Sequence, residues 1–180
     1  MPRLERTNCQ YCGGLYDHTD GWPRRCTDCG EVAFWSPEPV VNALIPVPGG
    51  LVGIRRNIEP YKGTLAFPGG YVDHGEPWQE AATREMREEL GLDLGETGWK
   101  ILEARTTRTN YFCLFVAPTN PGSLRLEDIP AVRDPAGVSN GEISEVVLLP
   151  FFGGAGADRI PLGVPSHNTF YKTLSPSRFP

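Results

Sequence analysis

The sequence has no long run of apolar residues. No stretch approaches the roughly 20 consecutive apolar residues that a membrane-spanning helix needs. Residues 1–30 also lack the apolar segment that a signal peptide needs before its cleavage site. These two absences exclude a membrane as partner and predict a cytoplasmic protein.

Basic residues are not in excess either. The chain has 17 Lys and Arg against 22 Asp and Glu, which gives a formal net charge of −5 at pH 7. A mildly negative protein offers no broad attractive field to a polyanion, so nucleic acid is not expected as a partner. At 180 residues the chain is long enough for one main domain and a small appendage.

Residues 1–36 are nearly free of aliphatic side chains before Val32, so apolar burial alone cannot fold them. What this segment does contain is cysteine, in two pairs whose members are each separated by two residues. In a reducing compartment this spacing favours a four-thiolate zinc ribbon over disulfides. Because four thiolates fill a tetrahedral site, the zinc is expected to be structural. The expected zinc ligands are Cys9, Cys12, Cys26 and Cys29.

The remaining cysteine and the three histidines have simpler interpretations. Cys113 stands alone in an apolar run and is expected to be a small buried hydrophobe. His18 could replace a cysteine ligand, but the preferred interpretation is a loop histidine. We expect His74 and His167 to be surface polar groups.

From Pro39 the composition changes to short β-type runs, and a main domain is expected over residues 37–180. Pro48-Gly49-Gly50 predicts a hairpin turn. The stretch Pro118–Gly141 predicts a long loop that is functional or mobile, and Ser166 is a plausible N-cap for a short helix over His167–Leu174. The expected strands are residues 40–45, 51–54, 65–67, 99–104, 111–116 and 145–149.

The clearest helix signal covers residues 77–90, which end just before Gly91. Glu85, Glu88 and Glu89 stand at i, i+3 and i+4, so they project from roughly a third of the helix circumference. Three such charges repel one another unless a cation gathers them. Carboxylate oxygens suit Mg²⁺ or Mn²⁺, and Mg²⁺ usually keeps waters and substrate phosphates as its other ligands.

The alternative is a solvated helix face with salt links such as Glu80 to Arg84. The surrounding pattern argues against that alternative: Gly70, five residues, Glu76, seven residues, then the run from Arg84 to Leu92. This pattern resembles the Nudix box at every defining position. The resemblance extends over about Pro39 to Pro150, although only the box itself is specific.

The resemblance implies an α/β fold, an α/β/α sandwich with a mixed β-sheet, preceded here by the zinc ribbon. It implies hydrolysis of a nucleoside diphosphate derivative by a metal-activated water. Carried over onto this chain, Glu85, Glu88 and Glu89 look like the catalytic metal ligands, and Gly70 would add a backbone carbonyl. Glu76 would brace the loop or touch a second metal.

Three further roles concern residues in and around the box. Arg84 would orient the carboxylates by salt bridging. The general base is Glu142, Glu145 or a glutamate of the helix, and we favour Glu142 because it lies in the loop ahead of the last strand. Arg55, at the end of a strand before the box, is a candidate for contact with substrate phosphate or sugar.

A zinc ribbon ahead of a Nudix domain resembles the NAD(H) pyrophosphatases, but residues 92–120 contain nothing like the Gln-Pro-Trp-Pro-Phe-Pro-type motif of those enzymes. NAD(H), ADP-ribose, nucleotide sugars and NTPs therefore all stay open as small-molecule nucleotide substrates. The competing class is a non-catalytic nucleotide-sensing module whose ribbon serves as an adaptor to nucleic acid or protein. Trp35 and Trp99 are expected in the core, with the interface of a homodimer as the alternative.

Overall fold

The structure is a computed structural model that describes residues 7–17, 21–94, 98–120, 122–151, 162–174, 177 and 179. His18, which was expected in a loop, lies outside these residues. The chain divides into two compact units, residues 1–37 and residues 38–180. Each unit has its own core and is described by itself.

The smaller unit consists of two turns that each carry a cysteine pair. In both turns a glycine with positive φ follows the pair: the N–H of Gly13 donates to the Cys9 carbonyl, and the N–H of Gly30 donates to the Cys26 carbonyl. The second turn joins two short antiparallel strands, β1 (Arg24–Arg25) and β2 (Val32–Ala33). The buried side chains of this unit are Cys9, Tyr16, Cys26 and Ala33, with Trp22 packed against them.

The larger unit contains two sheets. In the first, β3 (Glu38–Ala43) runs parallel to β8 (Tyr111–Pro118), and β8 pairs antiparallel with β7 (Trp99–Thr106), which makes the sheet mixed. In the second, β5 pairs antiparallel with its three neighbours. The strands of the second sheet are β4 (Pro46–Val47), β5 (Gly50–Arg56), β6 (Leu65–Ala66) and β9 (Ile143–Pro150).

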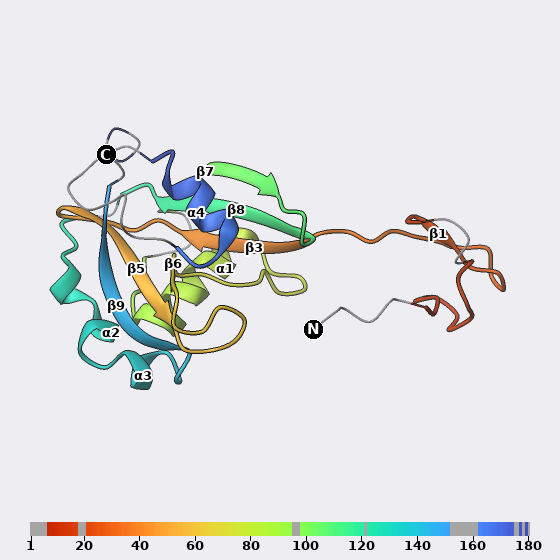
Figure 1. Ribbon diagram of the computed structural model, residues 1–180, viewed down its shortest axis with the longest axis horizontal. Coiled ribbons are helices and arrows are strands. Elements are labelled where there is room, and N and C mark those ends of the chain that lie inside the picture. Colours follow the sequence, from red (N-terminus) through yellow and green to blue (C-terminus); the bar gives the residue numbers. More distant parts are fainter. Residues whose placement is uncertain are drawn as a thin grey trace. The chain divides into compact units, whose positions relative to one another are not determined.

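Helices cover both faces of these strands, as Figure 1 shows. Helix α1 (Trp78–Glu85) continues into the π-helical segment η1 (Met86–Leu90), and its apolar stripe of Ala82, Met86 and Leu90 packs with Val41 of β3. On the opposite face, Phe170 and Tyr171 of α4 (Pro165–Tyr171) pack with Phe115 of β8. Successive residues of β8 alternate between the two cores, which confirms the α/β/α sandwich with a mixed sheet.

Most of the expected elements are present. Strands β5, β7, β8 and β9 are two or three residues longer than expected, β3 begins and ends two residues earlier, and β6 is one residue shorter. The hairpin at Pro48-Gly49-Gly50 is confirmed by the pairing of β4 with β5. The expectation of an element-free loop over Pro118–Gly141 is wrong, because three short helices occur there: η3 (Leu126–Asp128), α2 (Pro130–Arg133) and α3 (Pro135–Val138). Proline occupies the first position of both α2 and α3, where it favours the start of a helix. The high Pro and Gly content of the whole stretch nevertheless led to the prediction of a loop.

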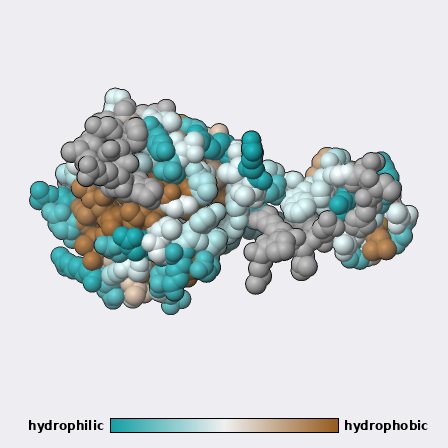
Figure 2. All heavy atoms as spheres, in the orientation of Figure 1, coloured by the Kyte–Doolittle hydropathy of each residue, from teal (hydrophilic) through white to brown (hydrophobic). Residues whose placement is uncertain are grey.

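The surface of the larger unit shows hydrophobic side chains gathered over β5 and β9 on the face seen in Figure 2. Leu148 of β9, which is 40% exposed, belongs to the exposed large hydrophobic residues of the chain. Trp99, in contrast, is buried in the core, as expected. Among the helices of the described residues, none combines the length and apolar character needed to cross a membrane.

His167 is buried, so the expectation of a surface polar group is wrong. It lies on α4, whose first residue is Pro165; the helix therefore starts ahead of the expected N-cap Ser166. The ring Nδ1 accepts a hydrogen bond from the Phe67 N–H (3.1 Å), so Nε2 carries the proton and donates to Asn42 Oδ1 (2.5 Å). Burial, with the nearby positive charge of Arg56, lowers the pKa of His167 to about 3.

We expect this histidine to make folding stability depend on pH. In the unfolded chain a histidine has a pKa of about 6.5, so below that pH only the unfolded state takes up the proton. Stability should therefore fall as the pH drops from about 6.5 towards about 3, by up to about 1.4 kcal/mol per pH unit. His167→Gln should show a shallower slope than wild type in urea unfolding between pH 7 and 5. The exposed His74→Gln is the matched control, and parallel slopes for wild type and His167→Gln would contradict the expectation.

Candidate functional site

The carboxylate-bearing helix ends in a turn wider than an α-helical turn. The change from α1 to the π-helical η1 falls between Glu85 and Met86, and π-turns of this kind occur often at functional sites. Gly91, with φ of 72°, ends the helix in the left-handed region that favours glycine. Glu85 and Glu89 are buried, whereas Glu88 is exposed.

Arg84 joins the acidic side chains of the box. Its Nε and Nη2 donate to the two oxygens of Glu76 (2.9 and 3.0 Å), and Nη1 donates to Glu85 (2.7 Å) and Glu88 (3.1 Å). Nη2 also donates to the Tyr71 carbonyl (2.8 Å), which ties the helix to the loop before it. Hydrogen bonding to Arg84 lowers the pKa of Glu76. The arginine thus holds the box loop and the carboxylates as one unit.

In the loop that precedes the helix, two glycines lie next to the buried carboxylates. The N–H of Gly69 donates to Glu89 Oε2 (2.7 Å), and the Gly70 carbonyl accepts from the Val41 N–H of β3 (2.9 Å). A Cβ atom placed on Gly70 would lie 2.3 Å from Glu85 Oε1. Glycine at position 70 therefore lets the Glu85 carboxylate pack directly against the backbone.

The buried glutamates are poorly stabilised as anions. Burial raises the pKa of Glu85, with contributions from the charges of Glu88 and Glu142, although Arg84 opposes this. Burial raises the pKa of Glu89 well above its usual range, and the charge of Glu85 adds to the effect. A divalent cation would stabilise carboxylates gathered in this way, and their oxygen donors suit such an ion.

A pocket of about 280 Å³ opens beside Glu88 and Glu89. Glu142, in the turn between α3 and β9, is brought to the same pocket as Glu89 from a distant part of the sequence. Glu145, the other candidate base, lies on β9 and pairs with Arg55. The pocket is lined by Glu88, Glu89, Val138, Ser139, Asn140 and Glu142.

The two arginines at the end of β5 are in different environments. Arg55 Nε donates to Glu145 Oε2 (2.8 Å), and its Nη1 donates to the Gly63 carbonyl (3.0 Å). The positive charge of Arg56, in contrast, acts on Glu89, although burial outweighs it in setting the pKa of that carboxylate. The sequence-based prediction of a substrate contact concerned Arg55.

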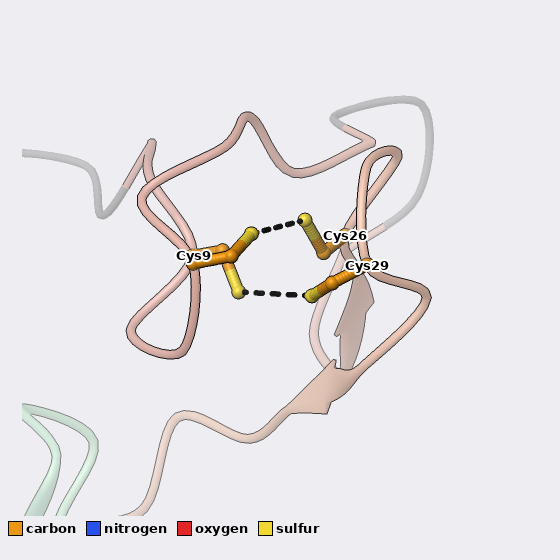
Figure 3. Close-up of side chains that lie close together, drawn as sticks. Cys9, Cys26 and Cys29 are labelled. Atoms are coloured by element: carbon orange, nitrogen blue, oxygen red, sulfur yellow. Dashed lines mark hydrogen bonds between the residues drawn. The ribbon is translucent and has the colours of Figure 1, made fainter.

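The cysteine pairs of the smaller unit meet in one cluster, and Figure 3 shows their thiols pointing toward one another. The Sγ atoms of Cys9 and Cys29 are 3.8 Å apart and those of Cys12 and Cys26 are 3.5 Å apart. All four ligand atoms lie within 4.8 Å of one another. Tetrahedral zinc with Zn–S bonds of about 2.3 Å places its sulfurs about 3.8 Å apart, so the cluster fits that ion. In the part of the chain that the structure describes, the glutamates do not form a cluster whose ligand atoms lie as close together as these sulfurs.

Backbone donors surround the thiols as well. The N–H groups of Tyr11 and Gly14 donate to Cys9 Sγ and Cys12 Sγ, both at 3.4 Å. The backbone N–H of Glu31 lowers the pKa of Cys29, but the neighbouring thiols and burial outweigh it and raise this pKa to about 12. Four thiolates at these distances therefore need a cation to coexist near neutral pH.

Comparison with known proteins settles the family of this chain. A family model described as the NUDIX domain matches residues 37–151, which include both sheets and the whole box. The chain belongs to the Nudix family. The Nudix domain thus accounts for most of the larger unit, and the cysteine cluster precedes it.

Relatives of this Nudix chain include two curated proteins. An ADP-ribose pyrophosphatase of Methanocaldococcus jannaschii is 41% identical over 59 residues, covering 33% of this chain and 35% of the relative. A Nudix hydrolase of Deinococcus radiodurans is 31% identical over 119 residues, covering 60% of this chain and 63% of the relative. The chain thus matches less than two thirds of the length of either relative.

Solved Nudix structures agree with the fold. The MutT protein from Methanosarcina mazei has a TM-score of 0.55 at 21% identity, over 78% of this chain and 95% of that one. The NUDIX domain of Shewanella oneidensis NrtR, solved in complex with ADP ribose, has a TM-score of 0.55 at 16% identity, over 76% and 85% of the two chains. At these identities the likeness concerns the fold alone.

Proposed function

We propose that this Nudix protein hydrolyses the pyrophosphate bond of a nucleoside diphosphate derivative with Mg²⁺ or Mn²⁺ as catalytic cofactor. The observation that carries the proposal is the set of carboxylates in and near the box: Glu85 and Glu89 are buried, and Glu88, Glu89 and Glu142 line one pocket. Two buried carboxylates destabilise the folded state unless a bound cation balances their charge.

Glu85, Glu88 and Glu89 are the proposed ligands of the divalent ion, together with the Gly70 carbonyl. When bound, such an ion lowers the pKa of a coordinated water and neutralises charge on the phosphoryl oxygens. Arg84 orients the carboxylates through its bonds to Glu85 and Glu88.

Three other residues have proposed roles. Glu142 is the proposed general base, because its carboxylate lines the pocket while Glu145 is paired with Arg55. Glu76 braces the loop through the Asp73 N–H (3.0 Å) and Arg84. Arg55 remains a proposed substrate contact. To bind substrate, its guanidinium would have to leave Glu145 or contact Glu145 and the substrate together.

ADP-ribose is the first substrate to test. A segment of 59 residues is 41% identical to a protein described as an ADP-ribose pyrophosphatase. NAD(H), nucleotide sugars and NTPs are the alternatives within the same reaction class. The cysteine cluster is proposed to hold a structural Zn²⁺, since four thiolates leave no position for water.

The test is a substrate panel of ADP-ribose, NADH, nucleotide sugars and dNTPs with Mg²⁺ or Mn²⁺, with products separated by chromatography. The proposal predicts metal-dependent cleavage of at least one of these compounds. Binding of ADP-ribose in calorimetry without cleavage of any compound would instead favour the non-catalytic nucleotide-sensing module.

The glycine in front of Glu85 gives a second expected result. Gly70→Ala should lower metal-dependent activity by at least about tenfold, because the new Cβ would displace the Glu85 carboxylate, which is 2.3 Å away. The thermal midpoint should change little, since the displaced group is a side-chain end. Gly98→Ala is the matched control, because a Cβ there would meet only Thr119 Oγ1, at 3.8 Å. Equal activity of the two variants would show that the space at Gly70 is not used.

A further inference from the structure

Glu142 reaches the pocket from a turn and not from a regular element. It follows α3 and precedes β9, and its side chain is exposed. Among the described residues, none donates a hydrogen bond to the Glu142 carboxylate. The position of this side chain relative to Glu89 must therefore be set by the backbone that carries it.

Asn57, the residue just after β5, holds that backbone from the side. Its side-chain Nδ2 donates to the Gly141 carbonyl (2.8 Å), and its backbone N–H donates to the Glu142 carbonyl (2.8 Å). The two bonds clamp adjacent peptide carbonyls, which limits rotation of the peptide between Gly141 and Glu142. Asn57 is half-buried, so this clamp is partly shielded from competing water.

The same turn is tied on its other side to α3. Ser139 Oγ, which is buried, donates to the Pro135 carbonyl (2.6 Å) and accepts from the Ile143 N–H (2.9 Å). Asn140 and Gly141 both have positive φ, 50° and 85°, so the chain reverses sharply just before Glu142. Two backbone hydrogen bonds close this turn, from the Gly141 N–H to the Ala136 carbonyl (2.8 Å) and from the Glu142 N–H to the Ser139 carbonyl (3.0 Å). Both bonds tie the turn to the α3 side alone, so contact with the β5 side depends on Asn57.

We propose that Asn57 is a positioning residue for Glu142: its two hydrogen bonds hold the turn in the shape that places the Glu142 carboxylate beside Glu89. The inference rests on the proposed function, because it matters for rate only where Glu142 takes part in the reaction. A carboxamide suits this place because the side chain must donate a hydrogen bond to a carbonyl. Aspartate has the same shape, but an ionised carboxylate has no proton to donate.

The kinetic test is a double-mutant cycle between Asn57→Ala and Glu142→Gln on whichever substrate the panel identifies. Asn57→Ala should lower kcat by at least about tenfold and leave KM within about twofold. In the Glu142→Gln background the same substitution should have almost no effect on kcat, because the group that it positions is already inactive. An equal loss of kcat in both backgrounds would overturn the proposal, since Asn57 would then act on something other than Glu142.

Two further variants separate this role from general support of the fold. Ser144→Ala removes a nearby hydrogen bond between β9 and β5, from Ser144 Oγ to the Arg55 carbonyl (3.4 Å). This variant should leave kcat unchanged. Asn57→Asp keeps the shape of the side chain but replaces the donor with a charged acceptor that repels the Gly141 carbonyl, so it should slow the enzyme at least as much as Asn57→Ala does. Should Asn57→Ala unfold, Asn57→Asp takes its place in the cycle.

Hydrogen exchange tests the clamp without any substrate. In Asn57→Ala the amides of Gly141, Glu142 and Ile143 should exchange at least about tenfold faster than in wild type, while those of β8 stay unchanged. Unaltered exchange in the turn overturns the proposal, whatever the panel shows. Absence of hydrolysis by the wild-type protein with faster exchange in the variant would instead count against the proposed function alone.

Discussion

Glu89→Gln is expected to lower kcat by at least about a thousandfold, which corresponds to about 4 kcal/mol in the activation barrier. Glu89 is the most deeply buried carboxylate of the box and lines the pocket. The amide would keep an oxygen to accept the Gly69 N–H but would lose the charge that attracts a divalent cation. Activity should be measured on the substrate that the panel identifies, over a range of Mn²⁺ concentrations.

The matched control lies on the same helix. Glu80, in the first turn of α1, is exposed and does not line the pocket, so Glu80→Gln should keep wild-type kcat. Isothermal titration with Mn²⁺ gives a second readout: binding should weaken in Glu89→Gln and persist in Glu80→Gln. Full activity of Glu89→Gln would remove the physical basis of the hydrolase proposal.

Loss of a zinc ligand is expected to unfold the smaller unit. Its described core consists of little more than two cysteines, Tyr16, Ala33 and Trp22, and structural zinc contributes about 10–16 kcal/mol of apparent binding energy in small domains of this kind. The wild-type chain is expected to bind one equivalent of zinc, and Cys26→Ser should abolish this binding, measured by chelation with a metallochromic dye. Hydrogen exchange should show loss of protection for the amides of Cys9 and Tyr16.

The larger unit should respond differently to the same change. It has two hydrophobic cores of its own, which contain none of the zinc-ligand cysteines, so its thermal transition should shift by only a few degrees, about the scale of a small stability change. Cys113→Ala provides the control: this thiol is buried on β8 and should leave the zinc content unchanged. Retention of an ordered smaller unit in Cys26→Ser would contradict a structural role for the metal.

The sequence alone was sufficient for features that depend on local spacing. The three glutamates of the box share one helix, so their approximate alignment follows from helical geometry whatever surrounds them. The cysteine pairs likewise lie within tight turns, where spacing alone brings the two thiols of each pair together. The strands were found because residues buried on both faces leave continuous apolar runs, although most of their ends were displaced by one or two residues.

Tertiary structure alone decided what depends on contacts between distant segments. Burial of His167 depends on Asn42 and Phe67, which no local pattern connects with it. The difference between Arg55 and Arg56 depends on the strand that pairs with β5. The placement of Glu142 beside Glu89 depends on Asn57, far away in the chain. Local spacing specifies which groups one helix or turn presents, whereas a pocket is assembled from several elements whose meeting is decided by packing of the whole core.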